Sequence, residues 1–380
     1  MPVIKNFKAE DYNGGSRIYS IVSTEDGLLY AGDKNGILEF DGESWRKIDC
    51  GFTVSSLAID SANTIHVAGS EGIGILVLDS TNTITYKSLN HLISSEKKIR
   101  RFRFSEVFNV QNQIVYVLKG EIVINTPESI RIIEFPYSFS YYQKVNDELF
   151  FYSPDEGIYR LIGNKLSLIN GSVQVKDKNI RAFFTINDVM YAYIEGFGFY
   201  NIKDDILIPQ KDIMAGLNLK GVQGAVQLDD TTFAIKSYYE GVVIINSKGE
   251  IESKYHYDEG LINNTGFSVY KDSWSNLWIG TASGISVIKL NFPFSKFNDQ
   301  KGIGTGYSSV LYDDQLYFAT SQGLYFAKKD IQGQLKFEKL FEGHVWRLHI
   351  IEDVLYFGSA SGIFYYLKQW LKPCNLLQVL

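Results

Sequence analysis

Arginine, tyrosine and amide side chains recur where successive short apolar runs of this sequence begin. They are Arg17, Tyr19, Arg101, Arg103, Tyr141, Arg181, Gln223 and Asn264, with Ser55 and Tyr142 at equivalent places. Guanidinium groups bind carboxylate and sulfate through paired hydrogen bonds, and aromatic rings suit cations and sugar rings. If the runs converge in space, these residues predict a site for a small molecule, a glycan or a peptide. A shift of one residue in strand register would instead turn such a side chain onto a packed face.

Motifs for catalysis or metal binding do not occur in the sequence. None of its five histidines belongs to an HxH, HExxH or mixed Cys/His cluster. There is no G-x-S-x-G elbow and no phosphate loop. Adjacent aspartates recur between apolar runs, at 204–205, 229–230 and 313–314, where Asp favours turns. We therefore predict no catalytic residue, no metal site and no cofactor.

The composition argues against several classes of protein. The chain has 380 residues, 45% hydrophobic and 14% aromatic, so it can bury a sizeable core and does not resemble a disordered protein. A net charge of −6 without a long basic run argues against nucleic-acid binding by this segment. No apolar run approaches the ~20 residues of a membrane span. The N-terminus lacks the apolar core of a signal peptide, and Cys50 and Cys374 form no disulfide framework or metal cluster.

The segments that carry the candidate residues belong to a repeat. "NLWIGTASGISVI" (276–288) has the pattern strand, turn, strand, and the pattern returns at 28–40, 65–78, 316–328 and 355–367. Weaker copies lie at 115–124, 149–161, 190–202 and 232–245. A glycine anchors each copy, and the mean spacing is about 41 residues, the size of one four-stranded propeller blade. The anchors are Gly36, Gly74, Gly120, Gly157, Gly198, Gly241, Gly284, Gly323 and Gly362. The sequence therefore predicts an all-β fold, a β-propeller of four-stranded antiparallel blades.

The conspicuous residues of the 276–288 hairpin are predicted to serve packing and turning. Gly280 suits a close approach between packed sheets, and Gly284 suits a turn with positive φ. Trp278 at mid-strand offers a large area for burial. We expect no functional site in this hairpin.

One repeat carries a family resemblance. "D-x-x-x-N-L-W-I-G-T-x-x-G-I" at 272–285 resembles the two-component-regulator propeller repeat, which usually has Gly where this chain has Ser275. Residues 26–48 and 54–76 are similar to the opening blades of the same proteins. The chain thus resembles the N-terminal sensor region, truncated, of bacterial triple-tyrosine/helix-turn-helix transcriptional regulators or hybrid sensor kinases.

The resemblance implies two successive propellers of seven blades, whereas this chain supplies nine repeats. "PVIKNF" (2–7) is similar to "PFSKFN" (292–297), and we interpret each as an outer strand that starts a ring. We therefore expect a seven-bladed propeller over 1–290, closed by residues 2–7. Residues 291–380 would form the first two blades of an incomplete second propeller and an irregular C-terminal tail. A single nine-bladed ring is the alternative.

The functional expectation follows from the resemblance. It implies a non-catalytic sensory, ligand-binding module of a bacterial signal-transduction regulator, whose output domains are absent from this chain. It also implies a periplasmic location and a homodimer in the full-length regulator. The alternatives are a propeller enzyme such as a lyase or glycan-active hydrolase, and a protein-interaction scaffold or inactive fragment. A cytoplasmic location is the alternative to the periplasm.

Overall fold

The computed structural model describes residues 2–93, 105–126, 129–135, 139–186, 188–203, 206–210, 220–248, 250–290, 302–329, 335–367 and 370–373. Its contacts divide the chain into two compact units, Pro2–Pro293 and Phe294–Leu380, and each is described by itself. The described residues form nine four-stranded antiparallel sheets, seven of them in the first unit. The predicted all-β propeller architecture is thereby confirmed.

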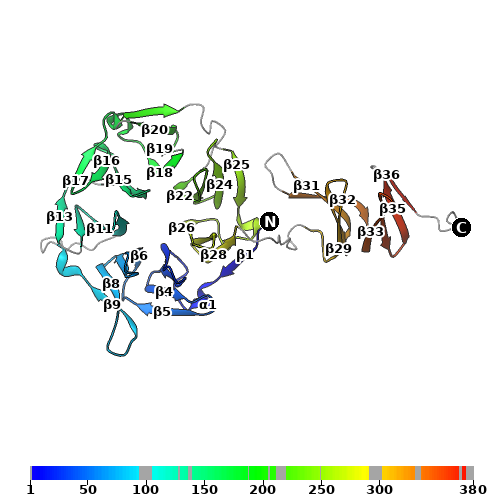
Figure 1. Cartoon of the computed structure of the whole chain (residues 1–380), viewed down its shortest axis with the longest axis horizontal. Helices are drawn as coiled ribbons and strands as arrows, with labels where there is room; N and C mark the ends of the chain where they lie inside the picture. Colours follow the sequence, from blue (N-terminus) through cyan, green and yellow to red (C-terminus); the bar gives the residue numbers. More distant parts are fainter. Residues whose placement is uncertain are drawn as a thin grey trace. The chain divides into compact units, whose positions relative to one another are not determined.

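The seven sheets of the first unit are blades that surround a common centre (Figure 1). Blade one contains β2 (Ser20–Ser23), β3 (Leu29–Gly32), β4 (Gly36–Phe40) and β5 (Trp45–Asp49). Blade two contains β6 (Val54–Ile59), β7 (Ile65–Gly69), β8 (Gly72–Leu78) and β9 (Ile84–Ser88). Blade three contains β10 (Glu106–Val110), β11 (Gln113–Leu118), β12 (Glu121–Asn125) and β13 (Ile130–Glu134). Blade four contains β14 (Tyr141–Val145), β15 (Glu148–Ser153), β16 (Gly157–Ile162) and β17 (Lys165–Leu168).

The remaining blades and the short helices complete the first unit. Blade five contains β18 (Ile180–Ile186), β19 (Val189–Ile194), β20 (Gly198–Lys203) and β21 (Ile206–Gln210). Blade six contains β22 (Val222–Gln227), β23 (Thr232–Ser237), β24 (Val242–Asn246) and β25 (Ile251–Tyr255). Blade seven contains β26 (Gly266–Lys271), β27 (Asn276–Thr281), β28 (Gly284–Lys289) and β1 (Ile4–Phe7). The helices are α1 (Ala9–Tyr12), η1 (Asn90–Leu92), η2 (Ser172–Val175) and η3 (Tyr257–Glu259).

The ring closes through the N-terminal strand. β1 pairs antiparallel with β28, from Ile4 opposite Ile288 to Phe7 opposite Ile285 (Figure 1). The Phe7 ring lies among Phe40, Trp45 and Trp278, with centroids 5.3 to 6.4 Å away. Blade seven thus takes its outer strand from the other end of the unit, so that no sheet edge stays open between first and last blade. The ring has seven blades, and the nine-bladed alternative is wrong.

The 276–288 hairpin has the structural role that the sequence predicts. Trp278 is buried, and its Nε1 donates a hydrogen bond to Asp272 Oδ2 at 2.8 Å. A Cβ on Gly280 would lie 2.6 Å from the carbonyl oxygen of Ile18 in the neighbouring blade, so only glycine fits there. Gly284 has φ 134°, and Ser275 has φ 61°, which explains why the related repeat favours glycine at that place.

One repeat anchor differs from its prediction. In blade two the strand after the hairpin begins at Gly72, whose φ is 140°, whereas Gly74 lies inside β8. The ring of Tyr86 and the backbone of Lys87 come so close to Gly74 that a Cβ would lie 2.3 Å from the ring. Because two glycines lie two residues apart, the sequence did not show which of them occupies the turn. In the structure the first of them, Gly72, has this position.

The second unit contains two blades. They are β29 (Gly306–Tyr312), β30 (Gln315–Thr320), β31 (Gly323–Lys329) and β32 (Leu335–Glu342), then β33 (Val345–Ile351), β34 (Val354–Ser359), β35 (Gly362–Leu367) and β36 (Trp370–Pro373). Buried Tyr317, Leu324, Leu348 and Phe357 form their shared core. Residues 370–373 of the expected irregular tail form β36, which pairs with β35 and completes the blade, and residues 374–380 of that tail lie outside the described residues. The expected outer strand at 292–297 lies outside the described residues.

Candidate functional site

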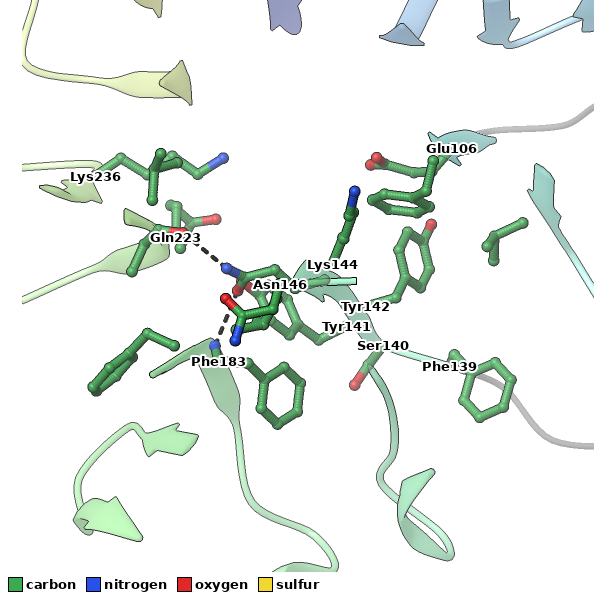
Figure 2. A pocket seen from close by; sticks show the side chains of 18 of the residues that line it. Glu106, Phe139, Ser140, Tyr141, Tyr142, Lys144, Asn146, Phe183, Gln223 and Lys236 are labelled. Atoms are coloured by element: carbon green, nitrogen blue, oxygen red, sulfur yellow. Dashed lines mark hydrogen bonds between the residues drawn. The ribbon is translucent and has the colours of Figure 1, made fainter. Parts of the chain in front are cut away.

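The inner strands of blades three to six line a cavity of about 1160 Å³, which we call the channel. Figure 2 shows its lining from close by. The first strand of each of these blades contributes to the wall: β10, β14, β18 and β22. The side chains that matter for its chemistry are Glu106, Tyr141, Tyr142, Lys144, Gln223 and Lys236. The volume lies slightly above the range typical of small-molecule sites.

A repeated pair of residues explains how blades one, two and seven join their neighbours in the inner ring. Ser20 lies opposite Gly32, Ser56 opposite Ala68 and Ser268 opposite Gly280 in blades one, two and seven. Each serine binds the backbone of the next blade; for example, Ser20 Oγ accepts a hydrogen bond from Leu57 N at 3.0 Å. A small residue on the second strand leaves room for the adjacent blade. In these three blades the position therefore joins neighbouring blades and carries no charge.

Blades three to six depart from that pattern: blade four has Tyr141 opposite Tyr152, and blade five has Ala182 opposite Tyr193. In blade three the serine position holds Glu106, opposite Val117. In blade six the sizes are reversed, because Gly224 on the inner strand lies opposite Lys236 on the second strand. Gly224 has φ 149°, and a Cβ there would lie 2.9 Å from Lys236 Cε and 3.2 Å from the Tyr141 hydroxyl. The missing side chain is what lets Lys236 reach the channel from the second strand.

Glu106 and Lys236 point toward each other from opposite sides of the channel (Figure 2). Burial raises the pKa of Glu106 to about 7, although the ammonium of Lys236 and a hydrogen bond from Ser56 act in the opposite direction. Burial also lowers the pKa of Lys236, and the carboxylate of Glu106 partly offsets this change. Lys236 Nζ donates a hydrogen bond to the carbonyl oxygen of Phe267 at 2.6 Å. The channel thus holds one acid and one base that both lie in a poorly hydrated environment.

Tyr141 and Gln143 tie the channel wall together. The Tyr141 hydroxyl donates to Gln143 Oε1 at 2.7 Å, and the same oxygen accepts a hydrogen bond from Phe183 N at 3.0 Å. Gln143 Nε2 donates to the carbonyl oxygen of Ala225 at 2.8 Å. One amide on blade four therefore joins blades five and six. Burial is the main cause that raises the pKa of Tyr141 above its usual range, so its hydroxyl stays protonated.

A second, smaller hollow of about 490 Å³ adjoins the channel, with Gln223 in the lining of both. We call it the mouth pocket; its other side chains include Arg181, Glu195, Tyr238 and Tyr239. Arg181 forms an ion pair with Glu195, with Nη2 3.0 Å from Oε2. The guanidinium keeps further donors that a ligand anion could use, and such an anion would compete with Glu195 for the arginine.

Bulges aim the residues at the start of the inner strands. In blades two, five, six and seven a register shift leaves one residue unpaired, and these residues are Ser55, Arg181, Gln223 and Phe267. A bulge bends the strand and redirects the unpaired side chain. Two of these residues, Arg181 and Gln223, line the mouth pocket. The shared geometry gives a physical reason why strand starts carry candidate ligand groups.

The structure brings some of the other candidates together. Arg17 lies over the ring of Phe267, with Cζ 6.0 Å from the centroid, and the Tyr19 ring centroid lies 5.7 Å from the same ring. Tyr238 of the mouth pocket also contacts Phe267, at 6.4 Å. Arg17 and Tyr19 therefore extend the aromatic edge of the mouth pocket.

The remaining candidates lie elsewhere. Asn264 is not among the side chains that line the channel or the mouth pocket. Its Oδ1 accepts a hydrogen bond from Tyr257 N at 2.6 Å and its Nδ2 lies 2.7 Å from His256 Nε2, so it organises the loop before β26. Arg101 and Arg103 lie outside the described residues.

Sequence reasoning missed Glu106 and Lys236, although a signal for Glu106 was available. Alignment of "SEVFNV" (105–110) with "SSLAID" (55–60) and "FSVYKD" (267–272) puts a carboxylate where these two repeats have serine. A charged residue at a position otherwise filled by a small polar one marks a candidate site. No such signal exists for Lys236, because a lysine on a second strand is ordinarily expected to be exposed to solvent.

No known family model matches this sequence, nor does any curated protein. Solved structures do share its fold. The extracellular domain of a B. thetaiotaomicron protein assigned as a hybrid two-component system is 15% identical, with a TM-score of 0.68 over 100% of this chain and 55% of that domain. A second such domain from the same organism is 12% identical, with a TM-score of 0.57 over 97% of this chain and 52% of the domain. This chain thus spans about half the length of each.

Virginiamycin B lyase from Staphylococcus aureus also has this fold. It is 13% identical, with a TM-score of 0.58 over 76% of this chain and 100% of the lyase. At such identities the likeness shows the propeller fold alone, because one fold serves many functions. In the described part of the chain, no helix is long and apolar enough to span a membrane.

Proposed function

We propose that this chain is the sensory, ligand-binding part of a bacterial signalling protein, located in the periplasm and acting through output domains outside this segment. The likeness to extracellular sensor domains over the length of the chain supports this proposal at the level of the fold. The chemistry rests on the channel. A non-catalytic site needs polar groups that a ligand can satisfy, and the channel supplies them in a partly enclosed space.

One observation carries the proposal: two half-buried groups of opposite charge, Glu106 and Lys236, face the same cavity. Burying such groups is unfavourable unless something binds them. Structural needs do not explain the pair, because the equivalent positions of blades one, two and seven hold serine opposite glycine or alanine. The mouth pocket, with Arg181, Gln223, Arg17 and Tyr19 at or beside it, would be the entrance.

The test is a thermal-shift screen of the purified chain against glycans, short peptides and small charged metabolites, with calorimetry on each compound that raises Tm. We expect a binder whose affinity falls about tenfold or more in Lys236→Met. Lys47→Met is the matched control, because Lys47 is exposed on β5. Binding that neither Lys236→Met nor Glu106→Gln weakens would contradict the channel as the site. Chemical conversion of the compound, followed by chromatography, would show an enzyme instead.

A further inference from the structure

We infer that the ligand of the channel is a zwitterion: a small molecule of the amino-acid or short-peptide class, with its ammonium group on Glu106 and its carboxylate on Lys236. This inference rests on the proposed function and specifies the ligand of the same cavity.

Glu106 has room for a cationic group of a ligand. Among the described residues, no lysine or arginine forms an ion pair with it, and Ser56 is the hydrogen-bonding side chain that acts on it. The residue is half-buried and lines the cavity. Lys144, which also lines the channel, is already paired with Asp147 at 3.0 Å. A ligand ammonium would give this carboxylate the charged partner that the protein does not provide.

Lys236 offers the complementary group. An ammonium has three hydrogen-bond donors, and the carbonyl oxygen of Phe267 takes one of them. The stem passes the space left by Gly224, so Nζ is held at the wall rather than free to swing into solvent. Within the described part of the chain, no carboxylate forms an ion pair with it. A ligand carboxylate could accept its remaining donors.

The two charges together select against simpler ions. Each alters the pKa of the other, so they lie close enough to interact across the cavity. A lone anion on Lys236 would be repelled by Glu106, and a lone cation on Glu106 would be repelled by Lys236. A molecule that carries both charges in the matching order meets two attractions and neither repulsion. A neutral sugar would bring no counter-charge to either group.

The wall between the charges suits an organic side chain. Tyr142 and Phe108 meet with ring centroids 6.4 Å apart, and Tyr141 and Phe183 with centroids 5.9 Å apart. All four line the channel. These rings offer apolar surface beside the charged pair, which favours amino acids with apolar or aromatic side chains over glycine.

The experiment is isothermal calorimetry of the full chain with the standard L-amino acids and glycylglycine. For the tightest binder, two analogues follow: the amine that lacks its carboxylate and the acid that lacks its ammonium. We expect both analogues to bind about tenfold or more weakly, because each leaves one buried charge unpaired. Glu106→Gln should make the amino acid bind no more tightly than the acid analogue, because the partner of its ammonium is gone. Lys236→Met should likewise remove its higher affinity relative to the amine analogue. Lys47→Met should change neither difference in affinity.

The results separate this inference from the proposed function. If an analogue or a neutral glycan binds as well as the zwitterion and Lys236→Met weakens it, the channel is a ligand site but the zwitterion inference is overturned. If no amino acid or dipeptide binds, the inference is overturned, and the wider screen decides the proposed function. If the zwitterion binds equally to Glu106→Gln, Lys236→Met and the parent chain, both proposals fail for this cavity.

Discussion

Gly224 and Lys236 lie opposite each other on adjacent strands of blade six, and the glycine leaves the space that the lysine stem fills. In blades one, two and seven the inner strand carries the larger residue of this pair and the second strand the smaller one. The reversal lets a cation on the second strand of blade six reach the channel. The charged channel therefore depends on one glycine.

Gly224→Ala tests this dependence. Alanine at a φ of 149° is strained, and its Cβ would lie only 2.9 Å from Lys236 Cε. We therefore expect the substitution to lower the free energy of unfolding by about 1–3 kcal/mol. Gly266→Ala is the control, because its Cβ would meet Lys236 Cβ at an ordinary 3.5 Å. Urea denaturation of both variants measures the difference. Equal losses would show that Gly224 is not specially required.

Glu106→Gln should change the pH dependence of stability. The folded-state pKa of Glu106 is raised from 4.5 to about 7, so its favourable contribution is present below pH 4.5 and is lost as pH rises through 7. At pH 5 the variant and the parent should have similar stability. At pH 8 the variant should be more stable, by on the order of 1–3 kcal/mol.

Denaturation of both chains across this pH range is the measurement. Glu43→Gln, an exposed change, serves as control and should leave the pH profile as it is. A Glu106→Gln profile parallel to that of the parent would mean that the carboxylate is as well solvated in the folded chain as in the unfolded one.

Trp278→Phe should destabilise the first unit through a lost hydrogen bond and a small cavity. Trp278 is buried and donates to Asp272 Oδ2, an oxygen that also accepts from Asn276 Nδ2. We expect a loss of about 1–3 kcal/mol. Trp274→Phe makes the same chemical change in the same hairpin at a side chain that is 62% exposed, and should stay within about 0.5 kcal/mol. Chemical denaturation of the pair gives the comparison, and similar losses would refute the assigned role.

Phe7→Ala should weaken the closure of the ring. Phe7 is buried, and its ring packs on Phe40 and Trp45, so its removal should cost about 3–5 kcal/mol. Opening of β1 would expose the edge of β28 and promote self-association, which size-exclusion chromatography detects. Lys47→Ala on β5 is the exposed control. A Phe7→Ala chain that melts like the parent and stays monodisperse would show that the ring does not need this contact.

The repeat and its packing residues could be predicted because they depend on local sequence. A glycine about every 41 residues, flanked by short apolar runs, has few explanations other than a blade, since strands and tight turns are set by neighbouring residues. The positive φ at Gly284 and the buried Trp278 follow from the same local pattern. Local sequence did not decide whether Gly72 or Gly74 occupies the turn of blade two, because the residue that Gly74 contacts, Tyr86, lies in the next strand.

The channel could not be predicted in this way. Arg181 and Gln223 were found as strand starts, but the bulges that aim them depend on pairing with the adjacent strand. Tyr141 was found as a strand start too, yet its partner Gln143 spans three blades through hydrogen bonds that no short pattern encodes. The sequence by itself determined the blades, their turns and the residues that pack them, because those choices are made between near neighbours along the chain. Only the tertiary structure decided that Glu106 of blade three and Lys236 of blade six face one cavity, because that meeting requires the curvature of the ring, the strand register and the empty position at Gly224.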